Sequence, residues 1–281
     1  MKGLDKIGIP YRFNDYRYIK KHPGEIACII GKPHLIFERT WKNPIILGAG
    51  IYSHPIECPE LFVKYPNVKR FLVPGDWMCK MCEPYYGNKV IAWPAGIDTE
   101  SWSPLPIDNK EFDFLIYDKI RWEHESFKNE LINPITRILG EQYMTYQFIR
   151  YGSYSPSELR DKLENSKAVI FLCEHETQGQ AYQQILSTNV PILAWDRGGY
   201  WQDPAYFPDK VKYQPVSSVP YWDNRCGLKF AGIDEFSIKL PEFVEKLDQF
   251  EPRRYILEHL TLEKSAQMYY DIFQQVSKEL A

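Results

Sequence analysis

Residues 173–200 read C-E-H-E-T-Q-G-Q-A-Y-Q-Q-I-L-S-T-N-V-P-I-L-A-W-D-R-G-G-Y, and this stretch decides the fold. An apolar run over 168–172 leads into it, and a polar loop with one glycine follows that run. A segment with helical spacing comes next, before a second apolar run over 191–195 that ends at two glycines. Strand, loop, helix and strand in this order form the unit of a parallel sheet, so the chain is predicted to be α/β.

The loop between the first strand and the helix is the part of this unit expected to bind a ligand. Open α/β sheets bind ligands at the carboxyl ends of their strands, and the amino end of a helix directs N–H groups and partial positive charge there. Gly179 leaves room for a diphosphate, while Glu176 and Gln184 offer hydrogen-bonding groups to hydroxyls. The loop is therefore predicted to bind a sugar linked to a diphosphate. An ordinary βαβ unit with a solvated acidic loop is the alternative.

The pattern Glu176-x-x-Gly179-x-x-x-x-Gln184, followed by V-P-I over 190–192 and two glycines at 198–199, resembles the E-x7-E segment of a known group of enzymes. These enzymes are the retaining, nucleotide-sugar-dependent glycosyltransferases of the GT-B fold that form family four. The resemblance implies two Rossmann-like domains that face each other across a cleft, with the donor bound by the second domain.

Site residues follow from the same resemblance, position by position. It implies that Glu176 contacts the donor sugar and that the amides of Gln180 and Ala181, beside Gly179, contact the phosphates. Family four has a second Glu that holds the ribose, and this chain has Gln184 there. A neutral hydrogen bond contributes about 0.5–1.5 kcal/mol, against about 1.5–3 kcal/mol for a charged one. Gln184 is therefore expected to hold ribose more weakly or in another orientation.

Cations that offset the charge of a departing nucleoside diphosphate are expected after the strand predicted over 112–117. Lys119 occupies the position of the family's Arg, and Arg121 is an additional cation nearby. His124 occupies the position of the family's Lys. We expect Lys119 to act in catalysis and to bind phosphate with Arg121, a solvated basic turn being the alternative. No Asp-x-Asp motif is present, so no metal is expected.

Two further residues follow predicted strands. His54 lies where many relatives carry a histidine that faces the acceptor, and it could hydrogen-bond a donor hydroxyl or the incoming alcohol. A histidine that caps its loop is the alternative. Tyr154 lies in the loop 152–154, where relatives seat the nucleobase, and could stack on it. A surface tyrosine is the alternative.

The domain boundaries are predicted from turns and prolines. The segment P-A-G-I-D over 94–98 resembles the turn that ends the family's first domain, and prolines at 104 and 106 with polar residues at 108–110 predict a linker. The expected domains are 1–103, joined by the last helix over 260–281, and 104–259. The start of the chain resembles the end of the family's first helix, which implies a shortened amino-terminal domain without the first strand and its glycine-rich loop.

Apolar runs and turn residues predict the other elements. Strands are expected over 8–13, 25–30, 45–47, 70–73 and 90–93 in the first domain, and over 112–117 and 146–151 in the second. Helices are expected over 1–7, 60–65, 76–85, 126–139, 157–163 and 234–250, with two more in 252–281.

Composition excludes several classes of function. The net charge is -3 and there is no basic tract, so nucleic acid is not an expected partner. No apolar run reaches the roughly 18 residues that span a bilayer, and no signal peptide is recognisable, which predicts a cytoplasmic protein. Cys79 and Cys82 form one C-x-x-C pair, but no second pair follows, so an amphipathic helix is favoured over a zinc site.

The leading hypothesis is a metal-independent glycosyltransferase that moves a hexose-like sugar from a nucleoside diphosphate to an alcohol with retention. Its partners would be a nucleotide-sugar, a carbohydrate or other alcohol acceptor, and a second copy of the chain. A noncatalytic nucleotide-sugar-binding relative, or a subunit of a glycosyltransferase assembly, is the alternative, favoured by Gln184, His124 and the shortened first domain. An unrelated α/β enzyme such as an epimerase is a third reading, but we identify no catalytic carboxylate pair for it.

Overall fold

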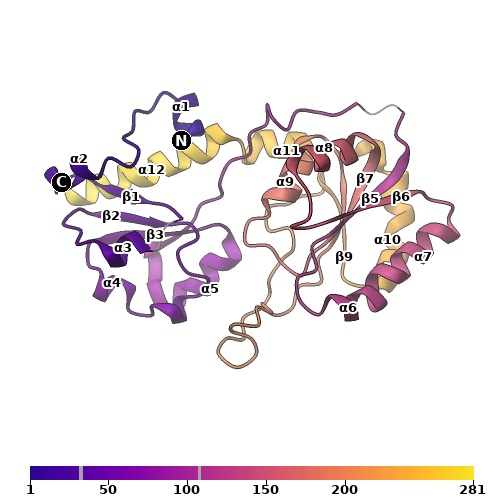
Figure 1. Ribbon diagram of the computed structural model, residues 1–281, viewed down its shortest axis with the longest axis horizontal. Coiled ribbons are helices and arrows are strands. Elements are labelled where there is room, and N and C mark those ends of the chain that lie inside the picture. The colour runs from indigo at the N-terminus through magenta and orange to yellow at the C-terminus, as the bar shows by residue number, and fades with distance from the viewer. Residues whose placement is uncertain (32–33, 107–108) are drawn as a thin grey trace. The chain divides into compact units, whose positions relative to one another are not determined.

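The computed structural model describes residues 1–31, 34–106 and 109–281 and shows two α/β units (Figure 1). Unit 1 consists of Met1–Gly96 together with Leu260–Ala281, and unit 2 consists of Ile97–His259. Each unit has its own sheet, and all the paired strands are parallel. Residues 97–103, which we expected in the first domain, lie in unit 2. Ile107 and Asp108, in the expected linker region, lie outside the described residues.

Unit 1 has a sheet with the strand order β1-β2-β3-β4. Its strands are β1 (Ala27–Ile29), β2 (Ile45–Gly48), β3 (Val68–Val73) and β4 (Val90–Ala92). Its helices are α1 (Lys2–Lys6), α2 (Tyr16–Lys21), α3 (His34–Glu38), η1 (Pro55–Glu57), α4 (Leu61–Lys64), α5 (Asp76–Tyr86), η2 (Gly87–Lys89) and α12 (Leu262–Leu280).

Helix α12 completes the core of unit 1, and Figure 1 shows it beside β1 and β2. Its apolar face carries Tyr269, Ile272 and Val276, which form one buried cluster with Ile46 of β2 and Leu72 of β3. Burying side chains of this size stabilises a fold by about 1.5–3 kcal/mol each. The helical spacing of these apolar residues is what made α12 predictable from sequence.

The strand expected over 8–13 is absent from unit 1. Tyr11, Arg12 and Phe13 are all exposed, so this segment has no buried face that would hold it in a sheet. Helix α2 follows and was not predicted, because none of its residues is buried and its sequence has no apolar stripe. Asp15 caps it by accepting a hydrogen bond from the Tyr18 amide at 3.0 Å.

Unit 2 has a sheet with the strand order β6-β5-β7-β8-β9. Its strands are β5 (Phe112–Asp118), β6 (Tyr146–Arg150), β7 (Ser166–Leu172), β8 (Ile192–Trp195) and β9 (Gly227–Phe230). Its helices are α6 (His124–Phe127), η3 (Lys128–Ile132), α7 (Asn133–Glu141), α8 (Pro156–Glu164), α9 (Gln180–Ser187), α10 (Ile233–Glu245), η4 (Leu247–Gln249) and α11 (Pro252–His259). The predicted strand, helix and strand around residue 179 are confirmed as β7, α9 and β8.

Helices cover both faces of this sheet, with α6, α7 and α10 on one side and α8 and α9 on the other (Figure 1). Ile116, Ile170 and Leu193 of the three central strands join one buried cluster with Ile135 of α7 and Leu240 of α10. Strands buried on both faces need apolar residues at almost every position, which explains the continuous apolar runs in the sequence.

The helix expected over 126–139 is divided into α6, the π-helical turn η3 and α7. Pro134, near the start of α7, has no N–H to donate to the carbonyl of Glu130 four residues earlier, which accounts for the wider turn there. Strand β9 was not predicted, because it is short and only part of it is apolar.

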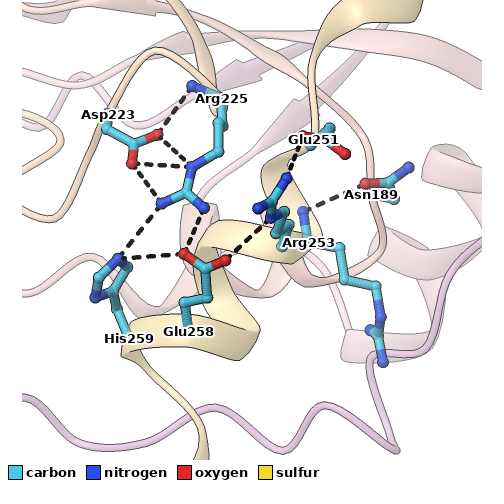
Figure 2. A network of polar contacts seen from close by, with 8 residues as sticks. Asn189, Asp223, Arg225, Glu251, Arg253, Glu258 and His259 are labelled. Atoms are coloured by element: carbon cyan, nitrogen blue, oxygen red, sulfur yellow. Dashed lines mark hydrogen bonds and ion pairs between the residues drawn. The ribbon is translucent and has the colours of Figure 1, made fainter.

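Two arginines connect helix α11 to other segments of unit 2. The Arg225 guanidinium bridges the carboxylates of Asp223 and Glu258 at 2.7 and 2.5 Å (Figure 2). The Arg253 guanidinium donates to the carbonyls of Thr99 at 3.1 Å and Trp102 at 3.0 Å. The segment after Ile97 is therefore held by unit 2. Among the described helices, none is both long and apolar enough to cross a bilayer.

Candidate functional site

Three loops of unit 2 meet at the carboxyl edge of its sheet. Asp118 at the end of β5 pairs with Leu172 at the end of β7, and Leu172 pairs with Trp195 at the end of β8. The strands therefore end level with one another, and the chain leaves all three at the same edge. These loops bring together most of the charged side chains that the sequence singled out.

The main feature of this edge is an ion pair between Lys119 and Glu176. The Lys119 ammonium lies 2.5 Å from a Glu176 carboxylate oxygen, and the two side chains are only 9% and 7% exposed. Burial favours a lower pKa for Lys119, but the charge of Glu176 and its hydrogen bond outweigh it and the pKa is raised. The ring of Tyr151 adds a cation–π contact at 4.1 Å. The two predicted residues therefore lie together, each as the counter-ion of the other.

A second carboxylate, Glu174, joins the loops after β5 and β7. One of its oxygens accepts the backbone N–H groups of Arg121 at 2.7 Å and Trp122 at 2.9 Å. Its other oxygen lies 4.0 Å from the Arg121 side chain. The Arg121 guanidinium also donates to the carbonyl of His175 at 3.1 Å. Arg121, predicted as a phosphate ligand, is thus folded onto the β7 loop.

His175 lies between these charges and is buried. Burial, and then the positive charges of Arg121, Arg197 and Lys119, lower the pKa of His175 to about 3. The imidazole is therefore neutral near pH 7, so the cations at this edge are not joined by a charged histidine.

The buried neutral state of His175 predicts a pH-dependent stability. Between pH 7 and 5 the unfolded chain gains a proton on His175 near pH 6.5, whereas the folded chain does not until about pH 3. The free energy of unfolding should therefore decrease as the pH is lowered from 7 to 5, and His175 should account for about 2 kcal/mol of this decrease. Urea unfolding at pH 7 and 5 measures it, and His175→Asn should lose this part of the pH dependence. Equal pH dependence in both proteins would contradict a buried neutral His175.

Helix α9 begins at this edge with Gly179 as its N-cap. Gly179 has φ +83°, and a Cβ there would lie 2.1 Å from an atom of the Tyr182 ring, so no larger residue fits. The next residues, Gln180 and Ala181, are exposed and half-buried, and Gln184 one turn on from Gln180 is half-buried. The first-turn amides of α9 have no acceptor within the helix, and the amino end of a helix is suited to an anion for this reason.

His124 is not part of this group of charges. Its Nε2 lies 2.7 Å from Asp118, whose other oxygen lies 2.5 Å from Arg150. The carboxylate of Asp118 thus engages His124 at the end of β5. His124, at the position of the family's Lys, is therefore bound to a carboxylate of the same chain.

Tyr154 and His54 are both held by local hydrogen bonds. The Tyr154 hydroxyl lies 2.5 Å from that of Tyr117 on β5, and Tyr154 is half-buried, with a pKa raised mainly by burial. His54 lies in unit 1, where its Nδ1 accepts the Ile56 amide at 3.0 Å and caps η1. Burial lowers the pKa of His54, against the charge of Glu57. His54 therefore has the capping role that the sequence left open as an alternative. The other candidate site residues all lie in unit 2.

Known proteins were compared with the whole chain. No protein-family model matches it, and no curated protein matches it. Solved structures do: lipopolysaccharide outer core galactosyltransferase WaaB has a TM-score of 0.57 at 11% identity, covering 98% of this chain and 80% of its own. TarM of S. aureus has a TM-score of 0.61 at 12% identity, covering 92% and 57%. The fold is that of the GT-B glycosyltransferases.

A third match is the structure of accessory secretory proteins 1, 2 and 3 of Streptococcus pneumoniae. It has a TM-score of 0.61 at 14% identity and covers 94% of this chain and 56% of its own. The chain thus spans less than two thirds of the length of this structure and of TarM.

The cysteines of unit 1 do not form a metal site in the described part of this GT-B chain. No cluster of three or more His, Cys, Asp or Glu side chains there could hold a metal ion. Burial raises the pKa of Cys79 and raises that of Cys82 to about 12, so both thiols stay protonated at neutral pH. Protonated thiols are poor metal ligands.

Sequence reasoning missed Glu174, His175 and Arg197, all within the quoted stretch. Their positions two or three residues beyond the ends of β7 and β8 were readable once those strands were predicted. The resemblance drew attention to Glu176 alone, because only that acid has the family's spacing. In the GT-B fold, charged residues just after a strand of the second domain are therefore candidate site residues even when they match no motif.

Proposed function

We propose that the chain transfers a sugar from a nucleoside diphosphate to an alcohol acceptor with retention and without a metal. The observation that carries the proposal is the buried Lys119–Glu176 pair beside the amino end of α9, on the carboxyl edge of a GT-B unit. A carboxylate for hydroxyls, a cation for phosphate and the amides at a helix amino end are the groups that a sugar diphosphate needs.

In this proposal the diphosphate binds between Lys119, Arg121 and the amides of Gln180 and Ala181. A helix amino end contributes at most about 2 kcal/mol, so the side-chain cations carry much of the stabilisation of the leaving group. Glu176 accepts hydrogen bonds from the sugar hydroxyls. Gln184, half-buried on α9, is assigned to the ribose, and Tyr154 to the side of the nucleobase.

The transfer step breaks the bond between the anomeric carbon and the diphosphate oxygen and forms a bond from that carbon to the acceptor oxygen. The acceptor proton passes to the departing diphosphate, on the face that it leaves. The cations stabilise the charge that grows on this oxygen, so they are needed more in the transition state than in the bound donor. UDP in the solved TarM structure supports a nucleoside diphosphate as the leaving group.

A noncatalytic nucleotide-sugar-binding relative, or a subunit of a glycosyltransferase assembly, is the second candidate. Two features favour it: Asp118 engages His124, and a neutral amide stands at Gln184. The match to a structure that contains three accessory secretory proteins is consistent with a subunit role. Binding of the donor is common to both candidates, and turnover separates them.

Nucleoside diphosphates are expected to raise the melting temperature of the protein. At a hundredfold excess over Kd, binding stabilises by about 2.7 kcal/mol, which corresponds to about 5 °C or more in a unit of this size. Thermal shift with a panel of nucleosides, monophosphates, diphosphates and diphosphate sugars measures this. A matched nucleoside without phosphates should give a much smaller shift. Release of nucleotide on adding an acceptor supports transfer, and binding without release supports the second candidate.

A further inference from the structure

Arg197 is a charged residue of the candidate site to which neither the sequence pattern nor the proposed mechanism gives a role. Trp195 ends β8 opposite Leu172 of β7, so Arg197 follows its strand by the same two residues as Glu174 follows β7. The two charges are close enough that Glu174 acts on the pKa of Arg197, and Arg197 in turn acts on that of His175. Arg197 therefore belongs to the same edge.

The surroundings of Arg197 hold its guanidinium in place without neutralising it. The guanidinium carbon lies 5.0 Å from the ring centroids of both Phe127 and Trp195. One nitrogen donates to the side-chain oxygen of Gln202. In the described part of the chain, Arg197 forms no ion pair with a carboxylate within 4.0 Å. The two rings lie against each other, with centroids 5.1 Å apart, so they contact the guanidinium from one side and leave N–H groups for other acceptors.

Counting the charges of the site also leaves Arg197 as the cation without a paired carboxylate among the described residues. Lys119 pairs with Glu176, and Arg121 lies 4.0 Å from Glu174. Arg197 is the remaining cation of the three that surround the neutral His175. Burial lowers its pKa, with Glu174 and Glu123 opposing this effect, so its charge is partly withdrawn from water. A half-buried charge without a counter-ion destabilises a protein unless a ligand supplies the opposite charge.

We propose that Arg197 binds a phosphate group of the ligand and is the third cation of the diphosphate site. This inference rests on the proposed function for the nature of the ligand. A guanidinium edge matches two phosphate oxygens, and the contacts of Arg197 with the adjacent rings of Phe127 and Trp195 limit the entropy lost on binding. The positive charge then comes from three loops, after β5, after β8 and at the start of α9, rather than from the β5 loop alone.

Binding of inorganic diphosphate and of a nucleoside diphosphate to wild type, Arg197→Gln and Arg197→Lys tests the inference. Arg197→Gln should weaken diphosphate binding about tenfold or more, as loss of one charged contact predicts. Arg197→Lys keeps the charge but not the planar edge, so its diphosphate affinity should lie between those of wild type and Arg197→Gln. Arg137→Gln, the same change at an exposed residue of α7, is the matched control and should leave affinity unchanged. Titration calorimetry at fixed salt measures all four proteins.

The melting temperature of the ligand-free proteins gives a second, independent result. If Arg197 is kept for a ligand, Arg197→Gln should melt no lower than wild type, because an uncompensated charge is removed. A clear fall would show that its ring contacts serve stability and would overturn the inference. So would equal diphosphate affinity in wild type and Arg197→Gln, or no diphosphate binding by wild type. Diphosphate binding that depends on Arg197, without sugar transfer in any donor and acceptor combination, would overturn the proposed function and leave the inference standing.

Discussion

Loss of both activity and stability is expected when either partner of the Lys119–Glu176 pair is removed alone. Lys119→Met leaves a buried carboxylate, and Glu176→Gln leaves a buried ammonium, each in a position less than a tenth exposed. Breaking a buried ion pair in this way destabilises by about 3 kcal/mol or more. Loss of one charged group at the reacting diphosphate or sugar should lower the transfer rate on the order of 10²–10³-fold.

The double variant Lys119→Met with Glu176→Gln separates the two effects. It contains neither charge, so its unfolding free energy should return to near that of wild type, because no uncompensated ion remains. Its transfer rate should stay as low as that of the single variants. Urea unfolding and nucleotide release measured on the same preparations give both values.

An exposed pair in the same unit is the control. Lys167 lies 2.8 Å from Asp113, with side chains 49% and 28% exposed. Lys167→Met should change stability by less than about 1 kcal/mol and leave transfer unchanged. Near-wild-type transfer in the double variant would remove Lys119 and Glu176 from the mechanism. A double variant less stable than either single one would show that the pair does not act as a unit.

The parts of the fold that could be predicted are those that local apolar pattern determines. Strands β5, β7 and β8 are buried on both faces and therefore stand out as apolar runs, and α12 shows a helical stripe. The family resemblance assigned Lys119 and Glu176 separately to the donor, and the structure brings them together because both come just after the neighbouring strands β5 and β7. Their contact, between residues 57 positions apart in sequence, depends on a strand order that the sequence did not predict.

The parts that could not be predicted depend on contacts without a sequence pattern. Helix α2 is held by its cap and by Asn43, whose amide donates to the carbonyls of Ile19, His22 and Glu25, rather than by a buried face. The sequence also does not show that 8–13 forms no strand. Whether such a segment joins a sheet depends on a neighbouring strand, which the segment itself does not reveal. In the site, Asp118 could have paired with Lys119 beside it, but the turn after β5 brings His124 to it, and Arg150 faces it from the neighbouring strand β6.

The second large effect is expected at Gly179. Gly179→Ala places a methyl group in a backbone conformation with φ +83° and 2.1 Å from the ring of Tyr182, which is fully buried. The left-handed conformation costs about 1 kcal/mol, and the overlap about 1–3 kcal/mol more, because the buried ring cannot move away. We expect a loss of about 3 kcal/mol in unfolding free energy. Relief of the overlap would also shift the start of α9, so nucleoside diphosphate binding should weaken in the same variant.

Gly152→Ala separates the two contributions. Gly152 has the same φ of +83°, but a Cβ there would meet no atom within 4 Å, so only the backbone strain of about 1 kcal/mol applies. The difference between the two variants in urea unfolding therefore measures the overlap with Tyr182. Equal losses would mean that the ring yields easily and that the close packing of Gly179 does not determine how α9 begins. A much larger loss at Gly179 would show that the amides of Gln180 and Ala181 are held in place by the ring beneath them, as a rigid anion site requires.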